Sequence, residues 1–386
     1  MTKRARKSPP AGEPPSSPPA LSPLGVHIPS PWSEAADSIT YDSPVLRPPV
    51  TVICGPKNSG KSTFSRHLVN ALLRRYTRVA YLDTDVGQPE FTPPGCLSLH
   101  ICPSRLSRRR CLFFGDISSK RDPKAYADSV FQLFDFYKEY RPSKLANPGE
   151  PMLPLVVNTP GWVKGIGYDL LVHMLTYMEP THVIQMRISS EHKNLPTGVF
   201  WSDVSQNEAV NLIYLHPADT DFSNQFCSMP ACCRVLIRKQ AHYLRDIRLI
   251  AYFQQCVPSD LNISTHKELA HALASIPPYE VAISGVKILH LHCQVPRSEI
   301  FHSLNATIVG LTVSSGESTD PVRHTPWCVG LGIVRGIDIS TDLLYVITPV
   351  PLCHLEKVDL LLQGFIEIPK CLLQISKIVE FVLHIL

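Results

Sequence analysis

The sequence lacks several patterns that identify common classes of protein. It has no stretch of about 18 consecutive apolar residues, so we expect no transmembrane helix and no membrane partner. Its opening, MTKRARKSPP, has no apolar segment, which argues against a signal peptide. No CxxC pair or HExxH spacing accompanies the 12 cysteines and 16 histidines, so we assign neither structural zinc nor a histidine metal ligand. We expect reduced, mostly buried thiols, as in a cytosolic or nuclear protein.

Charge is also scarce. Charged residues make up 18% of the chain and the net charge is +4, which permits nucleic-acid binding without arguing for it. Hydrophobic residues, at 44%, exclude a wholly disordered chain or a coiled coil. A length of 386 residues leaves room for about two domains.

Proline is concentrated at the start of the chain. Residues 1–49 hold 12 of the 36 prolines and few large apolar side chains, and we predict that this segment is disordered. Its basic cluster favours a nuclear import signal or an arm that touches RNA, whereas the alternative is a solvated charged terminus. The cluster consists of Lys3, Arg4, Arg6 and Lys7.

Strand and helix patterns alternate after residue 49. The β-branched run VTVIC, a helical spacing over residues 62–76 and the run RVAYLD predict strand, helix and strand, connected by a right-handed parallel crossover. Further strands are predicted over residues 153–158 and 181–187. Further helices are predicted over residues 122–140, 168–178 and 240–254. After residue 278 the sequence is rich in strand-forming runs separated by glycines and shows no helical periodicity.

The loop after the first predicted strand fits the pattern G-x-x-x-x-G-K-[ST] in full. Its glycines let the backbone wrap a phosphate, while the loop N–H groups and the helix N-terminus attract the anion. Lys61 is expected to bridge the β- and γ-phosphates of ATP, and Ser62 to offer its hydroxyl to Mg²⁺. A chance match is the alternative, and the flanking strand and helix argue against it. The predicted phosphate loop is Gly55, Pro56, Lys57, Asn58, Ser59, Gly60, Lys61, Ser62 and Thr63.

This loop completes the predicted fold class, which is α/β. We predict a P-loop NTPase-type parallel sheet with helices on both faces, followed by a smaller β-rich C-terminal domain. The predicted boundaries place the disordered tail at residues 1–49, the P-loop domain at residues 50–278 and the β-rich domain at residues 279–386.

An acidic pair follows one crossover later: Asp83 ends the second predicted strand and Asp85 lies two residues beyond it. Carboxylates at the carboxyl ends of parallel strands lie at the edge where ligands bind. They could hold Mg²⁺ through water or accept a proton from an attacking hydroxyl. These residues predict an ATP and Mg²⁺ site, but leave open whether water, a metabolite, a protein or a nucleic acid receives the phosphate.

Four motifs in order resemble one family. GPKNSGKST, DTDVGQ, NTPGWVKGIGYDLLVH and RDIRLIAYF look like the polynucleotide 5′-hydroxyl kinases of RNA processing. DTDVGQPEFTPPG is typical of the nucleolar, pre-rRNA-processing branch. The resemblance implies transfer of the γ-phosphate of ATP to the 5′-OH of RNA, with DNA left open as a second acceptor. It also implies a nuclear, nucleolar location, a role in rRNA processing and RNA-processing protein partners.

The resemblance also implies roles for individual residues. Asp85 would activate the 5′-hydroxyl or order the metal with Ser62. A tryptophan stacked on the terminal base suits an enzyme that reads no base edges, and arginines three apart on a helix can share one anion. The implied catalytic residues are Lys61, Asp85, Arg245 and Arg248, and the implied substrate-binding residues are Gln88, Thr159 and Trp162.

Each of these roles has an alternative. Trp162 could be a core residue, and the two arginines could lie on a solvated helix face. The turn at residues 115–118 occupies the place of a Gly-Ser-Thr-like stretch near the acceptor, but its Asp116 departs from that pattern and leaves its role open. For the whole protein, the rivals are an ATP-binding scaffold without turnover and a P-loop NTPase that transfers phosphate to water.

Overall fold

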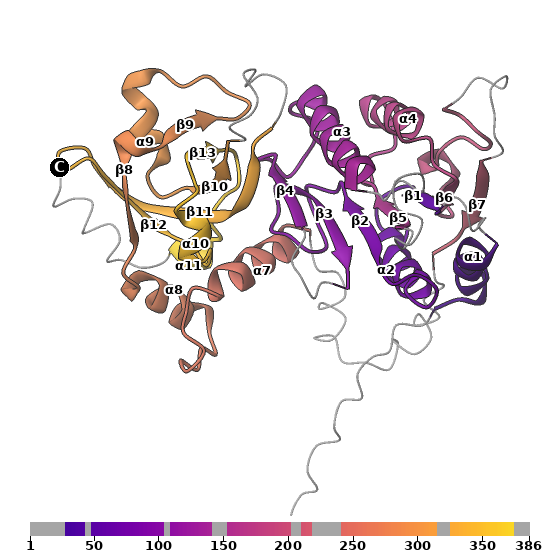
Figure 1. Cartoon of the computed structure of the whole chain (residues 1–386), viewed down its shortest axis with the longest axis horizontal. Coiled ribbons are helices and arrows are strands. Elements are labelled where there is room, and N and C mark those ends of the chain that lie inside the picture. Colours follow the sequence, from indigo (N-terminus) through magenta and orange to yellow (C-terminus); the bar gives the residue numbers. More distant parts are fainter. Residues whose placement is uncertain are drawn as a thin grey trace, which may run out of the picture.

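A computed structural model describes residues 28–42, 48–103, 109–140, 153–201, 210–217, 241–314 and 325–373. Within these residues, 13 strands belong to one mixed sheet, which runs through both lobes of the molecule (Figure 1). None of the described helices is long and apolar enough to cross a membrane. The helices are α1 (Ser30–Tyr41), α2 (Lys61–Leu72), α3 (Pro123–Tyr140), α4 (Ile166–Met178), α7 (Ala241–Gln254), α8 (His266–Ser275), α9 (Ile300–Leu304), α10 (Leu352–Leu355) and α11 (Lys370–Leu373), with short 3₁₀ turns η1 (Glu191–Lys193), η3 (Ile283–Gly285) and η4 (Arg297–Glu299).

The strands fall into a parallel group and an antiparallel group. Their bounds are β1 (Val50–Cys54), β2 (Val79–Asp83), β3 (Cys96–Cys102), β4 (Arg109–Phe113), β5 (Leu155–Asn158), β6 (His182–Met186), β7 (Asn211–Leu215), β8 (Tyr279–Ala282), β9 (Lys287–His290), β10 (Ile308–Val313), β11 (Trp327–Asp338), β12 (Leu343–Ile347) and β13 (Leu360–Gln363).

The first lobe is the predicted α/β unit. Strands β2, β5, β1, β6 and β7 are neighbours in that order, and all pair in parallel. Helices α3 and α4 cover one face of the sheet, and α1 and α2 cover the other (Figure 1). Because β1 and β2 are mostly apolar and buried on both sides, the sequence pattern located them within one residue.

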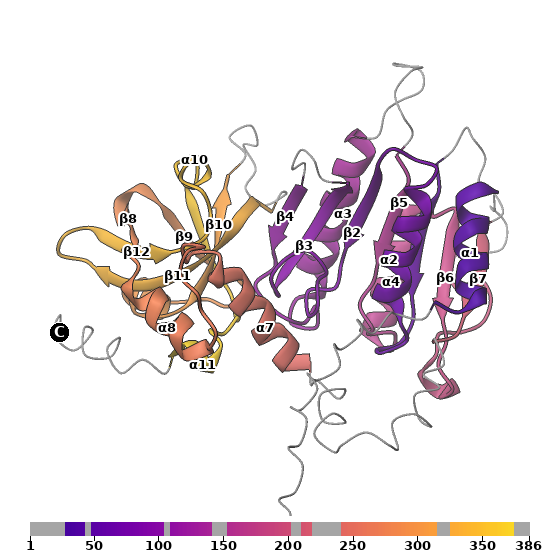
Figure 2. The same cartoon turned by 90° about the horizontal axis from the view of Figure 1, so that it is seen from below.

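The sheet is mixed rather than purely parallel. Strand β3 pairs antiparallel with β2, and β4 pairs antiparallel with β3. One antiparallel bridge, Leu112 to Trp327, then joins β4 to β11. The predicted β-rich C-terminal region is confirmed, and it continues the sheet of the first lobe (Figure 2).

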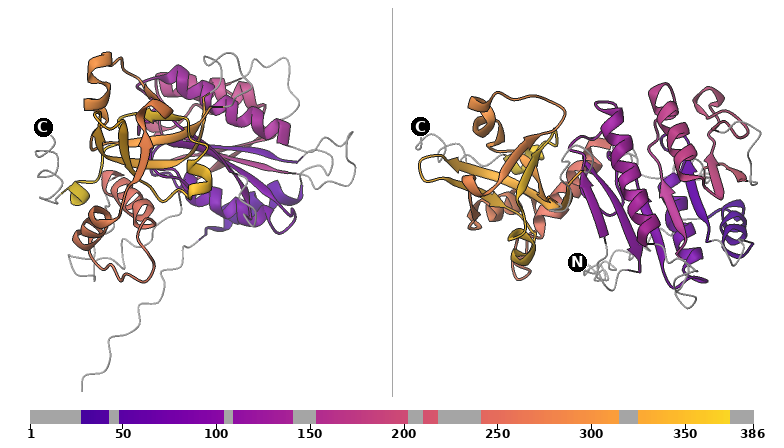
Figure 3. Two further views of the ribbon diagram at one scale, coloured as in Figure 1. Left: turned by 60° about the vertical axis from the view of Figure 1, so that its left-hand side comes forward. Right: turned by 45° about the horizontal axis from the view of Figure 1, so that its top comes forward.

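Helices α7 and α8 pack with the C-terminal strands. Phe253 of α7 and Leu269 of α8 share a buried cluster with Leu331 and Leu362. Side-chain packing therefore groups both helices with the second lobe, beside which they lie in Figure 3. The predicted domain boundary at residue 278 stays a prediction.

The prediction of disorder over residues 1–49 is wrong for Ser30–Tyr41, which form helix α1. The proline count concealed an apolar stripe at helical spacing, with Trp32, Ala36 and Ile39 all buried against α2 and β7. Pro31 does not oppose this helix, because it lies in the first turn, where no intrahelical N–H bond is lost. Residues 1–27 and 43–47 of the predicted tail lie outside the described part of the chain.

Trp32 anchors α1, and its removal should be costly. Its side chain is 2% exposed, its Nε1 donates to the carbonyl of His216 (2.7 Å), and its ring meets Phe64 edge-on. We expect Trp32→Ala to lower the free energy of unfolding by about 3–5 kcal/mol, measured by urea denaturation. Tyr41→Ala, on the same helix at 54% exposure, should change it by less than about 0.5 kcal/mol. Equal effects would contradict a packed α1.

Candidate active site

The phosphate loop connects β1 to α2 in a conformation that needs its glycines. Gly55 and Gly60 have φ values of 142° and 90°, and Asn58 also has positive φ. A Cβ on Gly55 would lie 2.4 Å from the carbonyl oxygen of Met186, and one on Gly60 would lie 2.8 Å from the Trp32 ring. The phosphate loop therefore packs against Met186 of β6 and Trp32 of α1.

Lys61 lies at the start of α2 and is 7% exposed. Its Nζ donates to the carbonyl oxygens of Gly55 (3.0 Å) and Pro56 (2.8 Å), which leaves the third N–H for an anion. Burial lowers the pKa of Lys61 to about 8, while the nearby Asp85 carboxylate opposes this shift. The ammonium is therefore still mostly charged at neutral pH.

Asp83 ends β2 and is fully buried. Its Oδ1 accepts hydrogen bonds from Asn158 Nδ2 (3.2 Å) and the Asp85 amide (3.3 Å), and its Oδ2 accepts one from the Glu90 amide. Burial raises the pKa of this carboxyl to about 7. Asp83 thus braces the loop that carries Asp85.

Asp85 is half-buried and faces the cleft. Its Oδ1 accepts hydrogen bonds from the amides of Gly87 (3.0 Å) and Gln88 (3.2 Å), which fix the carboxylate. Within the described residues its Oδ2 makes no hydrogen bond and is available to a ligand. Of the two acidic residues, Asp85 is therefore the one placed to act on a bound molecule.

One cleft of about 570 Å³ brings most of the predicted site residues together. Its wall includes phosphate-loop residues from Lys57 to Thr63, Asp85 and Gln88 from the loop after β2, and Trp162 from the loop after β5. Arg245 reaches it from α7, which extends from the second lobe toward the first (Figure 2). Both lobes therefore contribute to the site.

Trp162 forms a half-buried aromatic wall of this cleft. Its ring rests on Gly167, where an added Cβ would lie 2.4 Å from the indole. The preceding Gly161 packs on Lys57 of the phosphate loop, with only 2.8 Å between its ideal Cβ and the Lys57 backbone nitrogen. Two glycines thus bring the indole close to the phosphate loop.

Four predicted residues have less direct positions. The Thr159 hydroxyl is buried and donates to the carbonyl of Ile53 (2.8 Å), so it ties the end of β5 to β1. Arg248 of α7 is not among the residues that line the cleft. Gly55 and Pro56 contribute through the carbonyls that receive Lys61.

The structure adds cleft residues that the sequence analysis missed. Ser119 and Lys120 line it, as does Ser118 of the turn at residues 115–118, whose role the sequence leaves open. The Lys120 ammonium lies 5.0 Å from the centroid of the Trp162 ring. Asp116, which departs from the expected pattern, accepts a hydrogen bond from the Ser118 amide (2.9 Å) and pairs with Arg121. Asp116 therefore shapes the turn. The position of this turn in the sequence is the signal that could have identified the cleft residues beside it.

Asn158 at the end of β5 is a second omission. Its Nδ2 lies within hydrogen-bond distance of both Asp83 Oδ1 (3.2 Å) and the Ser62 hydroxyl (3.4 Å). It connects the acidic loop to the phosphate loop. Its place at the end of a strand beside β2 could have identified it, since side chains at these ends meet at one edge of the sheet.

A phosphate loop, an acidic residue on the next strand and an arginine opposite define a P-loop nucleotide-binding protein. The family model "mRNA cleavage and polyadenylation factor CLP1 P-loop" matches residues 55–215, and "NOL9-like, C-terminal domain" matches residues 274–369. The chain belongs to the family of the polynucleotide 5′-hydroxyl kinases named NOL9.

Similar proteins cover nearly the whole chain. The Arabidopsis thaliana polynucleotide 5′-hydroxyl-kinase NOL9 is 54% identical over 360 residues, covering 90% of this chain and 93% of the relative. The Homo sapiens relative of the same name is 32% identical over 86% of this chain, which spans 51% of that protein. The Danio rerio relative is 31% identical, over 85% of this chain and 47% of its own length. The chain thus spans about half the length of these two animal relatives.

Solved structures share the fold. The wild-type Clp1p–Pcf11p complex aligns with a TM-score of 0.59 at 16% identity, over 86% of this chain and 77% of the solved chain. At this identity the likeness concerns the fold alone. It confirms the predicted fold class, a P-loop sheet followed in the sequence by a β-rich region.

Proposed function

We propose that this protein is an ATP-dependent polynucleotide 5′-hydroxyl kinase that phosphorylates the 5′-OH of RNA. The single observation that supports this most is that Trp162 and Lys61 line one cleft, beside Asp85. A phosphate donor site alone would serve any nucleotide-dependent enzyme, whereas an aromatic wall next to it suits a base at the end of a strand. The Arabidopsis relative carries this activity in its name.

Four residues of the cleft act at the phosphates or at the acceptor in this proposal. Lys61 and Arg245 place positive charge where the transferring phosphoryl group develops negative charge. Asp85 accepts the proton of the attacking 5′-hydroxyl or helps to order the metal, as its fixed carboxylate allows. Gln88 lies beside it in the cleft, near the acceptor. Arg248, one helical turn from Arg245, would require closure of α7 to reach the phosphates.

The oxygen groups of the cleft suit Mg²⁺. Ser62 and Asp85 both line it, and a hydroxyl and a carboxylate are ligands that this hard cation accepts. These two residues would hold Mg²⁺ together with the ATP phosphates. When bound, Mg²⁺ neutralises charge on the phosphate oxygens.

The acceptor class follows from the kind of contact. Stacking on an indole face contributes about 1–3 kcal/mol per base and tolerates every base. An enzyme with this contact accepts strand ends of any sequence, and DNA ends stay a second candidate. We place the reaction in rRNA processing in the nucleolus, with RNA-processing proteins as partners, in keeping with the name of the relatives and the basic cluster near the start of the chain.

A transfer assay tests the proposal. The protein is incubated with γ-labelled ATP and Mg²⁺, and with RNA or DNA oligonucleotides that carry a 5′-OH. Labelled 5′ ends are the expected product. ATP binding without turnover would instead indicate a scaffold, and release of phosphate at a rate independent of RNA would indicate an NTPase that acts on water. Either result would refute the kinase.

Trp162 supplies a direct prediction for the acceptor. We expect Trp162→Ala to raise the KM for a 5′-OH oligonucleotide roughly 5- to 100-fold, because one stacking contact is lost. The KM for ATP should change little, since the phosphate loop and Lys61, rather than the indole, are placed to hold the phosphates. Trp162→Phe keeps an aromatic face and should recover most of the affinity. Steady-state kinetics with each substrate varied in turn measures this, and an unchanged KM for the oligonucleotide would remove Trp162 from the acceptor site.

A further inference from the structure

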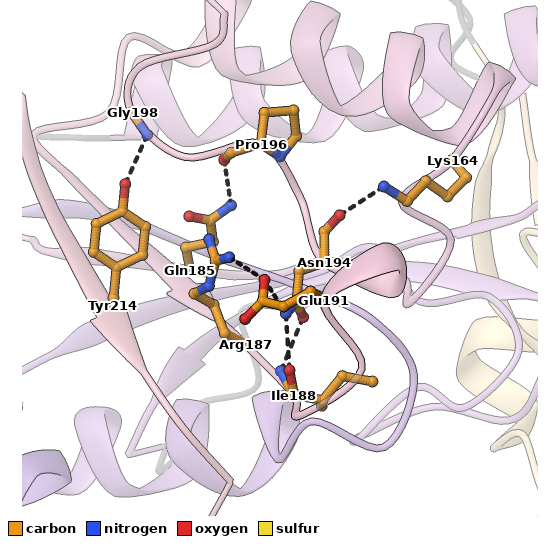
Figure 4. Close-up of polar contacts among 9 residues, drawn as sticks. All are labelled: Lys164, Gln185, Arg187, Ile188, Glu191, Asn194, Pro196, Gly198 and Tyr214. Atoms are coloured by element: carbon orange, nitrogen blue, oxygen red, sulfur yellow. Dashed lines mark hydrogen bonds and ion pairs between the residues drawn. The ribbon is translucent and has the colours of Figure 1, made fainter.

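The segment after β6 is held by its own side chains, as Figure 4 shows. Asn194, only 3% exposed, bonds both backbone groups of Ile188: its Oδ1 accepts from the amide (2.9 Å) and its Nδ2 donates to the carbonyl (2.8 Å). Arg187 pairs with Glu191, the first residue of the η1 turn, at 2.7 Å. We call residues 187–201 the β6 loop.

The later part of the β6 loop is also fixed to the sheet (Figure 4). Gln185 of β6 is fully buried, and its Nε2 donates to the carbonyl of Pro196 (2.8 Å). The Tyr214 hydroxyl of β7 accepts a hydrogen bond from the Gly198 amide (2.7 Å). The sheet holds this loop just after residue 194, and the Ile188 backbone holds the Asn194 side chain, so the Asn194 carbonyl has a fixed place.

Lys164 binds this carbonyl with its side chain. The Lys164 Nζ donates a hydrogen bond to the Asn194 carbonyl oxygen at 2.6 Å. Lys164 lies two residues after Trp162, in the same turn. The next residue, Gly165, has a φ of 53°, and no other atom of the described residues lies within 4 Å of its ideal Cβ. The turn therefore has a permissive backbone position in open space, which the Lys164 contact restrains.

The same strand supports the phosphate loop. Met186, the last residue of β6, lies against Gly55 through its carbonyl and near Gly60 through its side chain. The β6 loop begins at the next residue. The end of β6 therefore contacts the phosphate loop directly. The β6 loop that follows it contacts the turn of Trp162 through the bond between Asn194 and Lys164.

We propose that Lys164 and Asn194 are positioning residues that hold the Trp162 wall at a fixed place relative to the phosphate loop. This inference rests on the proposed kinase function, since it assigns the indole to the polynucleotide. The Lys164 ammonium is engaged by a protein carbonyl and acts through Trp162. Phosphoryl transfer needs the 5′-oxygen close to and in line with the γ-phosphate, so a displaced wall misplaces the acceptor.

Lys164→Met tests this directly, because it keeps the length of the side chain and removes the donor. We expect the KM for a short 5′-OH oligoribonucleotide to rise about tenfold, and the KM for ATP to stay within about twofold. Lys164→Arg keeps a donor and should recover part of the loss. In a Trp162→Ala background, Lys164→Met should add little, because the group that it positions is absent. Full additivity of the two changes would overturn the proposal.

A direct contact between Lys164 and a nucleic-acid phosphate is the competing account, and salt dependence separates the two. If Lys164 bound a phosphate, the slope of log affinity against log salt would fall by about one in Lys164→Met. Positioning predicts an unchanged slope. It also predicts that Asn194→Ala, which loosens the β6 loop without touching a phosphate, reproduces the rise in KM. Should Asn194→Ala not fold, the Lys164 variants decide alone.

The wild-type protein in the same assay separates the two hypotheses. If it transfers phosphate to 5′-OH ends and Lys164→Met matches it in both KM values, the positioning proposal is wrong and the kinase stands. If the wild type binds ATP but labels no 5′ end, the kinase itself is wrong.

Discussion

Replacing Lys61 with alanine is expected to lower phosphate transfer to a 5′-OH end by roughly a thousandfold or more. Its ammonium is the buried positive charge of the phosphate loop, and two carbonyls of the same loop hold it in place. In a site shielded from water, this charge interacts strongly with the γ-phosphoryl group as negative charge develops. The rate of labelled 5′-end formation at saturating ATP measures the loss.

Two further variants separate charge from packing. Lys61→Met has similar length and no charge, so it should be as inactive as Lys61→Ala. Lys267→Ala removes an exposed lysine from α8 in the second lobe and should keep the wild-type rate. If Lys61→Met retained more than about a tenth of the rate, electrostatic stabilisation by this residue would be too small for the proposed role.

The parts of the site that the sequence predicted share one property, which is that local pattern determines their place. The phosphate loop must join a buried strand to a helix, and β1 and α2 do so. Asp85 follows the next strand of the crossover, so it had to reach the same edge. Trp162 follows β5, which the topology inserts between β1 and β2.

What the sequence did not predict depends on contacts between distant segments. Lys120 belongs to no motif, and its position at the Trp162 ring results from the turn that Asp116 closes. The Thr159 hydroxyl donates to the carbonyl of Ile53, a contact between β5 and β1 that its motif does not reveal, and its role toward the substrate stays a prediction. Helix α1 escapes a prediction from composition because its 12 residues are a small part of a proline-rich segment.

Arg245 and Arg248 show the same limit within one helix. Their spacing of three predicts a shared face, but the face that meets the cleft is set by how α7 packs on the second lobe. Leu249 and Phe253 enter that core, and Arg245 is left at the cleft wall while Arg248 is not. The sequence therefore predicts which residues share a face of α7, whereas tertiary packing decides which part of that face meets the cleft.

Asp85→Asn is expected to lower kcat for phosphate transfer by about 10²- to 10⁴-fold, the range for loss of a positioned general base. The substitution is close to a pure charge change. The amides of Gly87 and Gln88 both donate to Oδ1, and an asparagine oxygen can accept the same two bonds. The turn should therefore persist while the proton acceptor and the metal ligand are lost. Single-turnover transfer from prebound ATP isolates this step.

Asp83→Asn should behave differently, because that carboxyl uses both oxygens as acceptors inside the protein. An amide nitrogen at either position would face an N–H donor of Asp85, Glu90 or Asn158. We expect Asp83→Asn to lower the free energy of unfolding as well as activity, while Asp85→Asn lowers activity alone. Asp128→Asn, exposed on α3, should change neither. If Asp85→Asn kept kcat and Asp83→Asn lost it without loss of stability, the two carboxylates would have to exchange roles, with the buried one acting as the base.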